Sequence, residues 1–382
     1  MKFGEIAELR REPIQPTRFN EYRNYLGYES IAPNSLHITQ WDTPKSVSSA
    51  KLAFHPNDTI YGRLRPYFRK VVWTQSNYGI CSSDFWVFKP KNGIDPRFLF
   101  YVAALPEFTN IASASSTGTR MPRANWEAIS EYEITDFTYE QQKAIGEFLG
   151  RFDDKIESNQ NLTEIILSLI GAQIDYELSD GSGDLFPVSE LAKFVNGGAY
   201  TKEASGTGRM VIRIADLNSG PSASTIYNDI DVPGDRLAHF GDLLMSWSGS
   251  LGIYVWVRDE AIVNQHIFKV ICTNFPAWLV HNRLNAVLHR FRSIAADKAT
   301  TMGHIQRKHL DETFVEVPVT KLGQLSHLCA PLWNRFISAQ LESMQLAALR
   351  DALLPELMSG RMRLDEAGRL VSEALNEEVA DV

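Results

Sequence analysis

The sequence has few cysteines, no long apolar run and no export signal, and each shortage excludes a class of protein. Three cysteines in 382 residues, Cys81, Cys272 and Cys329, lie far apart, with neither metal-type spacing nor the even count of a disulfide framework. No apolar stretch approaches the roughly 20 residues that a membrane-spanning helix needs. The opening residues, MKFGEIAELRREPIQP, lack an apolar signal core. We therefore expect reduced, buried thiols in a cytoplasmic protein without a membrane partner.

Signatures of catalysis are also missing. The sequence contains no G-x-x-x-x-G-K-[ST] phosphate loop, no G-x-G-x-x-G after a strand, and no H-E-x-x-H or H-x-E…C-x-x-C set. The acidic cluster DDKIE (Asp153–Glu157) falls in a helical pattern, where charge runs are usually solvated faces. We expect no catalytic residue, metal site or cofactor in this chain.

The chain has fewer basic than acidic residues, and most of the acidic excess lies in one segment. The net charge is −8. Residues 140–184 carry 3 basic and 10 acidic side chains, whereas residues 1–139 carry 16 and 14 and residues 185–320 carry 13 and 13. The two larger blocks are therefore neutral to slightly basic, which is compatible with DNA binding through local patches.

One arrangement of residues occurs twice. The matching pairs, in order, are FGEIAEL (3–9) with VSELAKF (188–194), HPNDTIYGRLRPYFRKVVW (55–73) with HFGDLLMSWSGSLGIYVWV (239–257), SASSTGTRMPRANWEAISEYEIT (113–135) with ADKATTMGHIQRKHLDETFVEVPV (296–319), and FLGRFDDKIESNQNLTEIILSLI (148–170) with LWNRFISAQLESMQLAALRDALL (332–354). The second pair aligns Asp58 with Asp242. A fifth pair, YGICSSDFWVFKP (78–90) with EAIVNQHIFKVIC (260–272), lies between the second and the third. Over the five pairs the offset stays between 182 and 185, so the sequence predicts a tandem duplication.

Each repeat has a strand-rich part followed by a long helix. Short β-branched and aromatic runs bounded by Gly, Pro and Asn predict strands, with shorter helices around them. The first long helix should begin at a capping box formed by Thr138 and Gln141. Thirty to forty helical residues make a rod of roughly 45–60 Å. We predict an α+β fold in which two α/β domains are separated by long helices that pack as an antiparallel coiled pair, with pseudo-twofold symmetry.

The order of these parts resembles the specificity subunit of type I restriction–modification enzymes, from about Lys2 to Arg363. The most similar stretches are EQQKAIGEFLGRFDDKIESNQNLTEIILSLIGAQ (140–173) and LRDALLPELMSGRMRL (349–364). The second helix departs from the family's opening, reading KLGQLSHL where the first has YEQQKAIG. The resemblance implies target-recognition domains at residues 1–137 and 185–320, conserved helical spacers at 138–184 and 321–364, and an acidic tail at 365–382.

The resemblance also implies a function. Such a subunit reads two half-sites of an asymmetric bipartite DNA target and docks two methyltransferase subunits, with restriction subunits as further possible partners. S-adenosylmethionine and ATP would then be bound only by those partners. Two alternatives remain open: a coiled-coil scaffold that does not read DNA, and a self-contained nuclease or methyltransferase.

Two groups of residues are candidates for DNA contact, because hydroxyl, Gly, Arg and Lys residues before a short helix can bind phosphate or a base edge. In the first repeat these are Thr117, Gly118, Thr119, Arg120 and Arg123, together with Arg63, Arg65, Arg69 and Lys70. In the second repeat they are Ser246, Trp247, Ser248, Ser250, Thr301, Gly303, His304, Gln306, Arg307 and Lys308. Turn formation and solubility are the alternative roles.

The helices carry apolar residues spaced three and four apart, which predicts seams for helix packing or partner docking. The predicted seam residues are Ile145, Phe148, Phe152, Leu162, Ile166, Leu169, Leu332, Phe336, Leu349 and Leu353.

Overall fold

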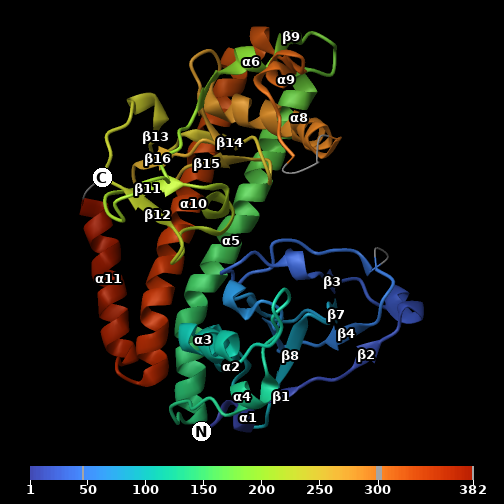
Figure 1. Cartoon of the computed structure of the whole chain (residues 1–382), viewed down its shortest axis with the longest axis vertical. Coiled ribbons are helices and arrows are strands. Elements are labelled where there is room, and N and C mark those ends of the chain that lie inside the picture. The colour runs from blue at the N-terminus through green and yellow to red at the C-terminus, as the bar shows by residue number, and fades with distance from the viewer. Residues whose placement is uncertain (45–46, 298–302, 381–382) are drawn as a thin grey trace. The chain divides into compact units, whose positions relative to one another are not determined.

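The computed structural model describes residues 1–44, 47–297 and 303–380, and the chain divides into two compact units (Figure 1). Unit 1 comprises Met1–Glu157 and Gln345–Val382, and unit 2 comprises Ser158–Met344. Both boundaries fall inside the two longest helices, α5 (Tyr139–Glu177) and α10 (Leu322–Ser359). Each unit therefore contains one strand-rich domain and part of both helices.

Unit 1 contains two four-stranded sheets. The first has the order β1 (Ala7–Leu9), β8 (Phe85–Pro90), β5 (Thr59–Gly62), β6 (Val71–Trp73), and the second has the order β2 (Pro13–Ile14), β4 (Lys51–Phe54), β7 (Gly79–Cys81), β3 (Tyr25–Leu26). The helices are α1 (Phe3–Ile6), α2 (Pro96–Ala104), α3 (Pro106–Ala114), α4 (Trp126–Ser130) and α11 (Leu364–Ala380), with 3-10 turns η1 (Pro16–Glu21), η2 (Tyr28–Ser30) and η4 (Pro66–Phe68).

Unit 2 has two four-stranded sheets and one two-stranded sheet. Their orders are β10 (Lys193–Asn196), β17 (Ile267–Ile271), β14 (Leu243–Ser246), β15 (Gly252–Val255); then β12 (Ile226–Asn228), β11 (Arg209–Ile212), β16 (Ala261–Val263), β13 (Leu237–Ala238); and β18 (Phe314–Val317) with β9 (Asp184–Pro187). The helices are α6 (Val188–Leu191), α7 (Ile214–Ser219), α8 (Ala277–Asp297) and α9 (Arg307–Asp311), with η5 (Gly234–Arg236) and η6 (Val319–Lys321).

The two units repeat one topology. Strand order β1-β8-β5-β6 corresponds to β10-β17-β14-β15, and all pairings in both sheets are antiparallel. The turn that enters β5 is also repeated: Asp58 Oδ2 accepts from the His55 N–H at 2.8 Å, as Asp242 Oδ2 does from His239 at 2.7 Å. The predicted duplication is confirmed, as is the pairing of Asp58 with Asp242.

The second sheets share only three strands. The run β4-β7-β3 matches β13-β16-β11, including a parallel pair in each, β3 with β7 and β11 with β16. The fourth strand is added at opposite edges, β2 beside β4 but β12 beside β11. The repeats therefore differ in which edge of this sheet carries the added strand.

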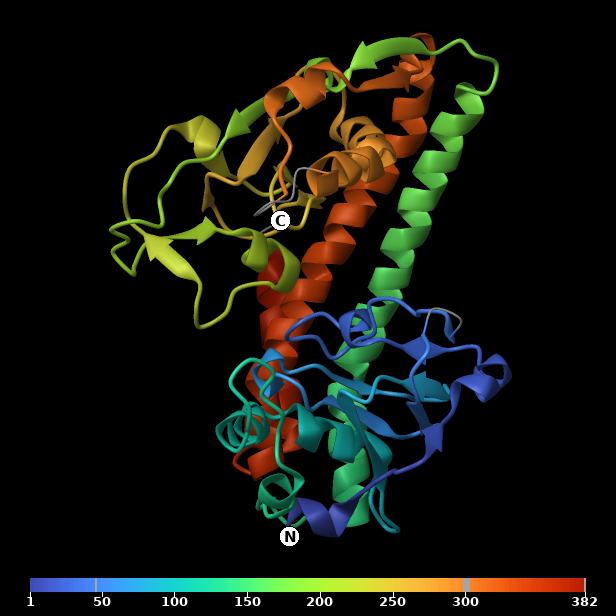
Figure 2. The ribbon, with the colours of Figure 1, turned by 45° about the vertical axis from the view of Figure 1, so that its right-hand side comes forward.

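Within each unit the long helices pack antiparallel (Figures 1 and 2). In unit 2, Asn159 donates to Glu342 at 3.0 Å, while the charged groups of Glu177 and Lys321 lie 4.0 Å apart, so the two chains run in opposite directions. The predicted capping box is present, because the Thr138 N–H donates to Gln141 Oε1 at 2.9 Å and the Gln141 N–H donates to Thr138 Oγ1 at 3.3 Å.

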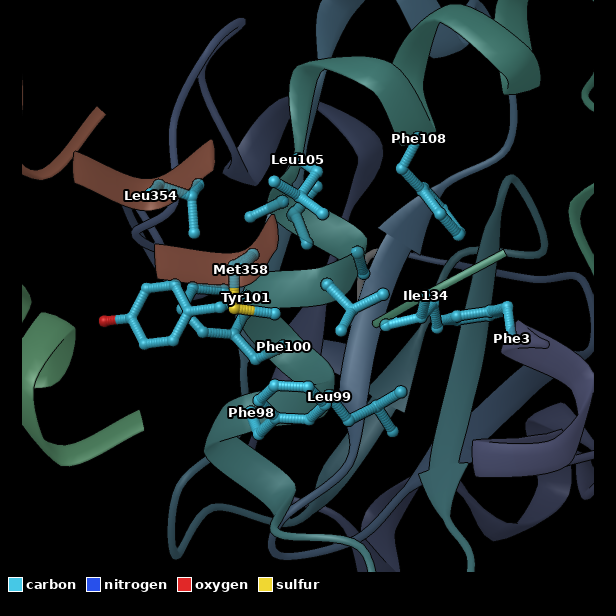
Figure 3. Packing of buried hydrophobic residues seen from close by; sticks show 14 of the residues in the cluster. Phe3, Phe98, Leu99, Phe100, Tyr101, Leu105, Phe108, Ile134, Leu354 and Met358 are labelled. Carbon is cyan, nitrogen blue, oxygen red and sulfur yellow. The ribbon is translucent and has the colours of Figure 1, made fainter. Parts of the chain in front are cut away.

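The core of unit 1 joins its domain to the helices. Figure 3 shows Leu354 and Met358 of α10 beside Phe100 and Tyr101 of α2. In each unit the domain buries apolar surface against its part of the long helices. The compact units therefore cross the predicted bounds of recognition domains and spacers, which stay a prediction. The stretch predicted as an acidic tail also differs: Leu364–Ala380 forms α11, and Ala367 is fully buried in this core.

Candidate nucleic-acid interface

In unit 1, two predicted groups of basic residues meet on one two-stranded ribbon. The Ala124 N–H donates to the Arg63 carbonyl at 2.9 Å, and the Arg65 N–H donates to the Pro122 carbonyl at 2.7 Å. Thr117 and Arg123 exchange two backbone hydrogen bonds of 3.0 Å, which close the intervening loop. We name residues 63–65 and 117–124 ribbon 1. The backbone pairing thus brings together residues some 60 positions apart in the sequence, a contact that the sequence analysis did not predict.

Unit 2 repeats this pairing. The Ile305 N–H donates to the Trp247 carbonyl at 3.0 Å, and the Gly249 N–H donates to the Gly303 carbonyl at 3.0 Å. We name residues 247–249 and 303–305 ribbon 2. Matching the central bridges, Leu64 with Arg123 and Ser248 with His304, gives offsets of 248 − 64 = 184 and 304 − 123 = 181. The second offset lies below the predicted range of 182 to 185, so that range is wrong for this segment. The structural counterpart of Arg123 is His304.

Ribbon 1 presents hydroxyls and cations. Thr117, Gly118, Thr119 and Arg120 are exposed in its loop, as is Arg65 on the facing strand. Arg65 Nη2 donates to the Arg120 carbonyl at 3.4 Å, which steadies the loop. These groups could bind a chain of phosphates, because the exposed guanidinium groups lie on one ribbon.

Beside this ribbon lies a hollow of about 570 Å³ that combines arginines with aromatic rings. Its lining includes Arg10, Arg11, Arg63, Arg123, Trp86 and Trp126. Arg10 is bound to buried Asp58 at 2.7 Å, whereas Arg11 is exposed. Sequence reasoning missed both residues; an Arg-Arg pair directly after the repeated FGEIAEL segment was the available signal.

Arg69 and Lys70 do not join the ribbon surface, and DNA contact by these two side chains is not supported. Lys70 is 2% exposed, and its Nζ donates to the Tyr28 carbonyl at 2.8 Å and lies 4.1 Å from the Tyr28 ring centre. Arg69 Nε donates to the Ala104 carbonyl at 2.9 Å. Burial lowers the pKa of both groups. Their charged ends are satisfied inside unit 1.

The predicted serines of the second repeat likewise include both buried and exposed side chains. Ser246 is fully buried, and its Oγ donates to the Ser250 carbonyl at 2.6 Å while accepting from the Gly252 N–H at 2.8 Å, so it shapes the turn. Ser248 is 3% exposed on ribbon 2, whereas Ser250 is exposed. Turn formation, the alternative role considered for this stretch, is therefore the role of Ser246.

Ribbon 2 carries an aromatic and imidazole cluster. The Trp247 ring centre lies 5.4 Å from that of His266 and 6.4 Å from that of His304. Gln306, Arg307 and Lys308 are exposed at the start of α9, directly after the ribbon, and Gly303 forms part of it. Thr301 lies outside the described residues.

The predicted seam residues are mostly enclosed. Ile145, Phe152, Ile166, Phe336 and Leu353 are buried, Phe148, Leu162, Leu332 and Leu349 are half-buried, and Leu169 is 40% exposed. Two further apolar residues of α5 are more exposed, Ile165 at 64% and Tyr176 at 72%. Positions 165, 169 and 176 fall on one helix face at 100° per residue, so they form a stripe that the described part of the chain leaves exposed. We name it the α5 stripe.

The described part of the chain shows no group of three or more His, Cys, Asp or Glu side chains placed to hold a metal ion. In the same residues, no helix is both long and apolar enough to cross a membrane. The three cysteines are free thiols: Cys81 and Cys329 are buried, and burial raises the pKa of the half-buried Cys272 to about 12.

Comparison with known proteins gives consistent matches. Residues 1–167 match the family described as "Type I restriction modification DNA specificity domain". The specificity subunit of the type I restriction enzyme MjaIX from Methanocaldococcus jannaschii is 24% identical over 96% of this chain and 93% of its own length. The EcoDI specificity subunit from Escherichia coli is 30% identical over 44% of this chain and 40% of its own.

Solved structures match at lower identity. The HsdS subunit from Thermoanaerobacter tengcongensis is 16% identical, with a TM-score of 0.39 and coverage of 95% of this chain and 96% of that one. The type I S subunit from M. genitalium is 14% identical, with a TM-score of 0.48 and coverage of 94% and 95%.

Proposed function

We propose that this chain, which resembles the specificity subunits of type I restriction enzymes over nearly its whole length, is the DNA-recognition subunit of such a complex. Residues 1–167 carry the matching specificity domain, and the similarity to the archaeal relative extends through both repeats. The chain reads two half-sites of a bipartite DNA target, one with each unit. Because the two repeats have diverged in sequence, the two half-sites differ.

The observation that carries this proposal is the repeated ribbon. A two-stranded ribbon fits the major groove of B-form DNA, and backbone N–H groups and hydroxyls in its loop can bind phosphates. Ribbon 1 places Arg65 and Arg120 on one exposed surface, and ribbon 2 leads directly into Arg307 and Lys308. The overall charge of −8 does not oppose this role, since the acidity is concentrated in the first spacer.

We expect partner subunits to carry out the catalytic steps. Two methyltransferase subunits would bind S-adenosylmethionine and transfer its methyl group, and restriction subunits, where present, would use ATP. This chain itself supplies no catalytic group. The α5 stripe supports docking of a methyltransferase subunit, because exposed apolar side chains on a rigid helix are the usual anchors of a protein interface.

Replacing both Arg65 and Arg120 with Ala should weaken binding of the assembled complex to every DNA sequence by a similar factor. Each exposed guanidinium that binds a phosphate releases about one counterion, so the slope of log K against log salt concentration should fall by about 0.9 for each phosphate that the variant no longer neutralises. Titration of fluorescent cognate and non-cognate duplexes at several salt concentrations measures both quantities.

The matched control is Arg18→Ala, which removes an exposed arginine of unit 1 outside the ribbon, where it pairs with Glu21. This variant should keep the affinity and salt slope of the wild type. If the Arg65 and Arg120 variant, folded and in complex, also keeps both, ribbon 1 does not contact the DNA backbone.

A further inference from the structure

Three equivalent positions carry different chemistry in the two units. The Arg63 N–H donates to the Asp84 carbonyl at 3.0 Å, and the Trp247 N–H donates to the His266 carbonyl at 3.1 Å, so Asp84 corresponds to His266. The ribbon pairings already match Arg63 with Trp247 and Arg123 with His304. Unit 1 therefore has two arginines and a carboxylate where unit 2 has one tryptophan and two histidines.

In unit 1 the carboxylate fixes one of the arginines. Arg123 Nη2 donates to Asp84 Oδ1 at 2.8 Å, with 39% of the arginine side chain and 24% of the aspartate side chain exposed. A guanidinium group has five N–H donors in a planar fork, and this contact uses one of them. The remaining donors of Arg123 include one N–H on each terminal nitrogen, which is the pair needed for bidentate contact with a base edge.

The second arginine adds positive charge at the same place. Arg63 lies over the Trp86 ring, 5.9 Å from its centre, and its Nε is enclosed without a hydrogen-bond partner. Burial and the charge of Arg123 both lower the pKa of Arg63, whereas Asp84 partly offsets them. Two neighbouring guanidinium groups, of which only Arg123 is paired with the carboxylate, favour a partner with several acceptors and no facing donor.

Guanine is the base that meets this requirement. Its major-groove edge presents two acceptors, N7 and O6, whereas adenine presents a donor beside N7. Unit 2 has no guanidinium group at these three positions. There the Trp247 Nε1 and His266 Nδ1 atoms are enclosed without hydrogen-bond partners.

We infer that unit 1 reads a guanine through Arg123, oriented by Asp84 and backed by Arg63, and that unit 2 reads its half-site without an arginine at the equivalent ribbon position. This inference rests on the proposed function and adds the identity of one base and of the side chain that reads it. Asp84 is a positioning residue, because it acts on the base through Arg123.

The test uses the complete complex of this chain with its methyltransferase partner and the duplex that it methylates. Each guanine of the target is replaced in turn by 7-deazaguanine, which lacks the N7 acceptor. With the wild-type chain, one guanine of one half-site should lose roughly tenfold to hundredfold in affinity, the discrimination expected of a bidentate contact. With Arg123→Ala, the same replacement should cause no additional decrease in affinity.

Two more variants distinguish a change in base recognition from a loss of folded protein. Arg123→Gln should shift the preference at that position from guanine towards adenine, since glutamine pairs with the adenine edge. Asp84→Asn should reduce discrimination at the same position and leave the other half-site unchanged. Arg65→Ala is the control, because it should lower affinity without changing the effect of any base replacement.

Different experimental results would contradict the proposed function and this inference. A complex that binds all sequences equally would overturn the proposed function. A complex that is sequence-specific, but tolerates 7-deazaguanine at every guanine of the target, would overturn only the inference. The base scan on the wild-type chain decides this even if a variant of Arg123 fails to fold.

Discussion

Replacing Arg350 with Ala is expected to destabilise unit 1 by about 3–5 kcal/mol, because it leaves a buried carboxylate without its cation. Arg350 of α10 is 4% exposed and pairs directly with Asp153 of α5, which is 7% exposed. The Tyr101 hydroxyl donates to the same carboxylate, and His37 Nε2 lies 3.1 Å from it. This cluster joins the domain of unit 1 to both of its helices.

The pKa of Asp153 is lowered, which favours the charged form of the carboxylate. Burial raises this pKa, but the neighbouring His37 and the charge of Arg350 outweigh burial, so the pKa lies below its ordinary value. A lowered carboxylate pKa contributes stability above the unfolded-state pKa, and this contribution is lost as the pH falls through the folded-state value. The whole decrease in the free energy of unfolding caused by Arg350→Ala should therefore be present at pH 7.

Chemical denaturation at pH 7, followed by circular dichroism, measures the change. Arg335→Ala is the control, because Arg335 is exposed on the same helix, and it should alter stability by less than about 0.5 kcal/mol. The double variant Asp153→Leu with Arg350→Met should be more stable than Arg350→Ala, since it removes both charges. A decrease below about 1 kcal/mol in Arg350→Ala would show that the carboxylate finds another partner or water.

Introducing glutamate at both Ile165 and Leu169 should abolish stable binding of the methyltransferase subunit. These residues are two of the three that form the α5 stripe, and burying two carboxylates in an apolar interface removes two anchors and adds a desolvation cost. We expect the dissociation constant to rise at least about a hundredfold. Because both side chains are already exposed, the free chain should keep its thermal midpoint.

Analytical ultracentrifugation of the two subunits measures this effect. Gln160→Glu adds a carboxylate to an exposed position of α5 on a different face and should leave assembly unchanged. If the stripe variant assembles with wild-type affinity, the methyltransferase subunit docks elsewhere on the chain.

Patterns that depend on local spacing could be predicted from the sequence. The start of α5 follows from Thr138 and Gln141, whose side chains bond across one helical turn. The duplication also follows, because the repeated segments keep their order and nearly constant separation. The contact between the Arg63–Arg65 and Thr117–Arg123 segments was not predicted, because it depends on the backbone pairing of ribbon 1.

What depends on distant neighbours could not be predicted. Lys70 reads as one more cation in a basic stretch, but Tyr28, about 40 residues earlier, encloses it. Ile165 and Ile166 are adjacent isoleucines of α5, yet the structure exposes the first and buries the second. The match of Arg123 with His304 appears only from hydrogen bonds, since an offset of 184 would pair Arg123 with Arg307.

The central claim is that this chain determines which DNA sequence is methylated. The most direct measurement is single-molecule sequencing of methylated bases in a host that expresses the methyltransferase partner with and without this chain. We predict one asymmetric motif, made of two half-sites with a fixed gap, that is methylated only when the chain is present. The same methylation pattern in both hosts would contradict the account.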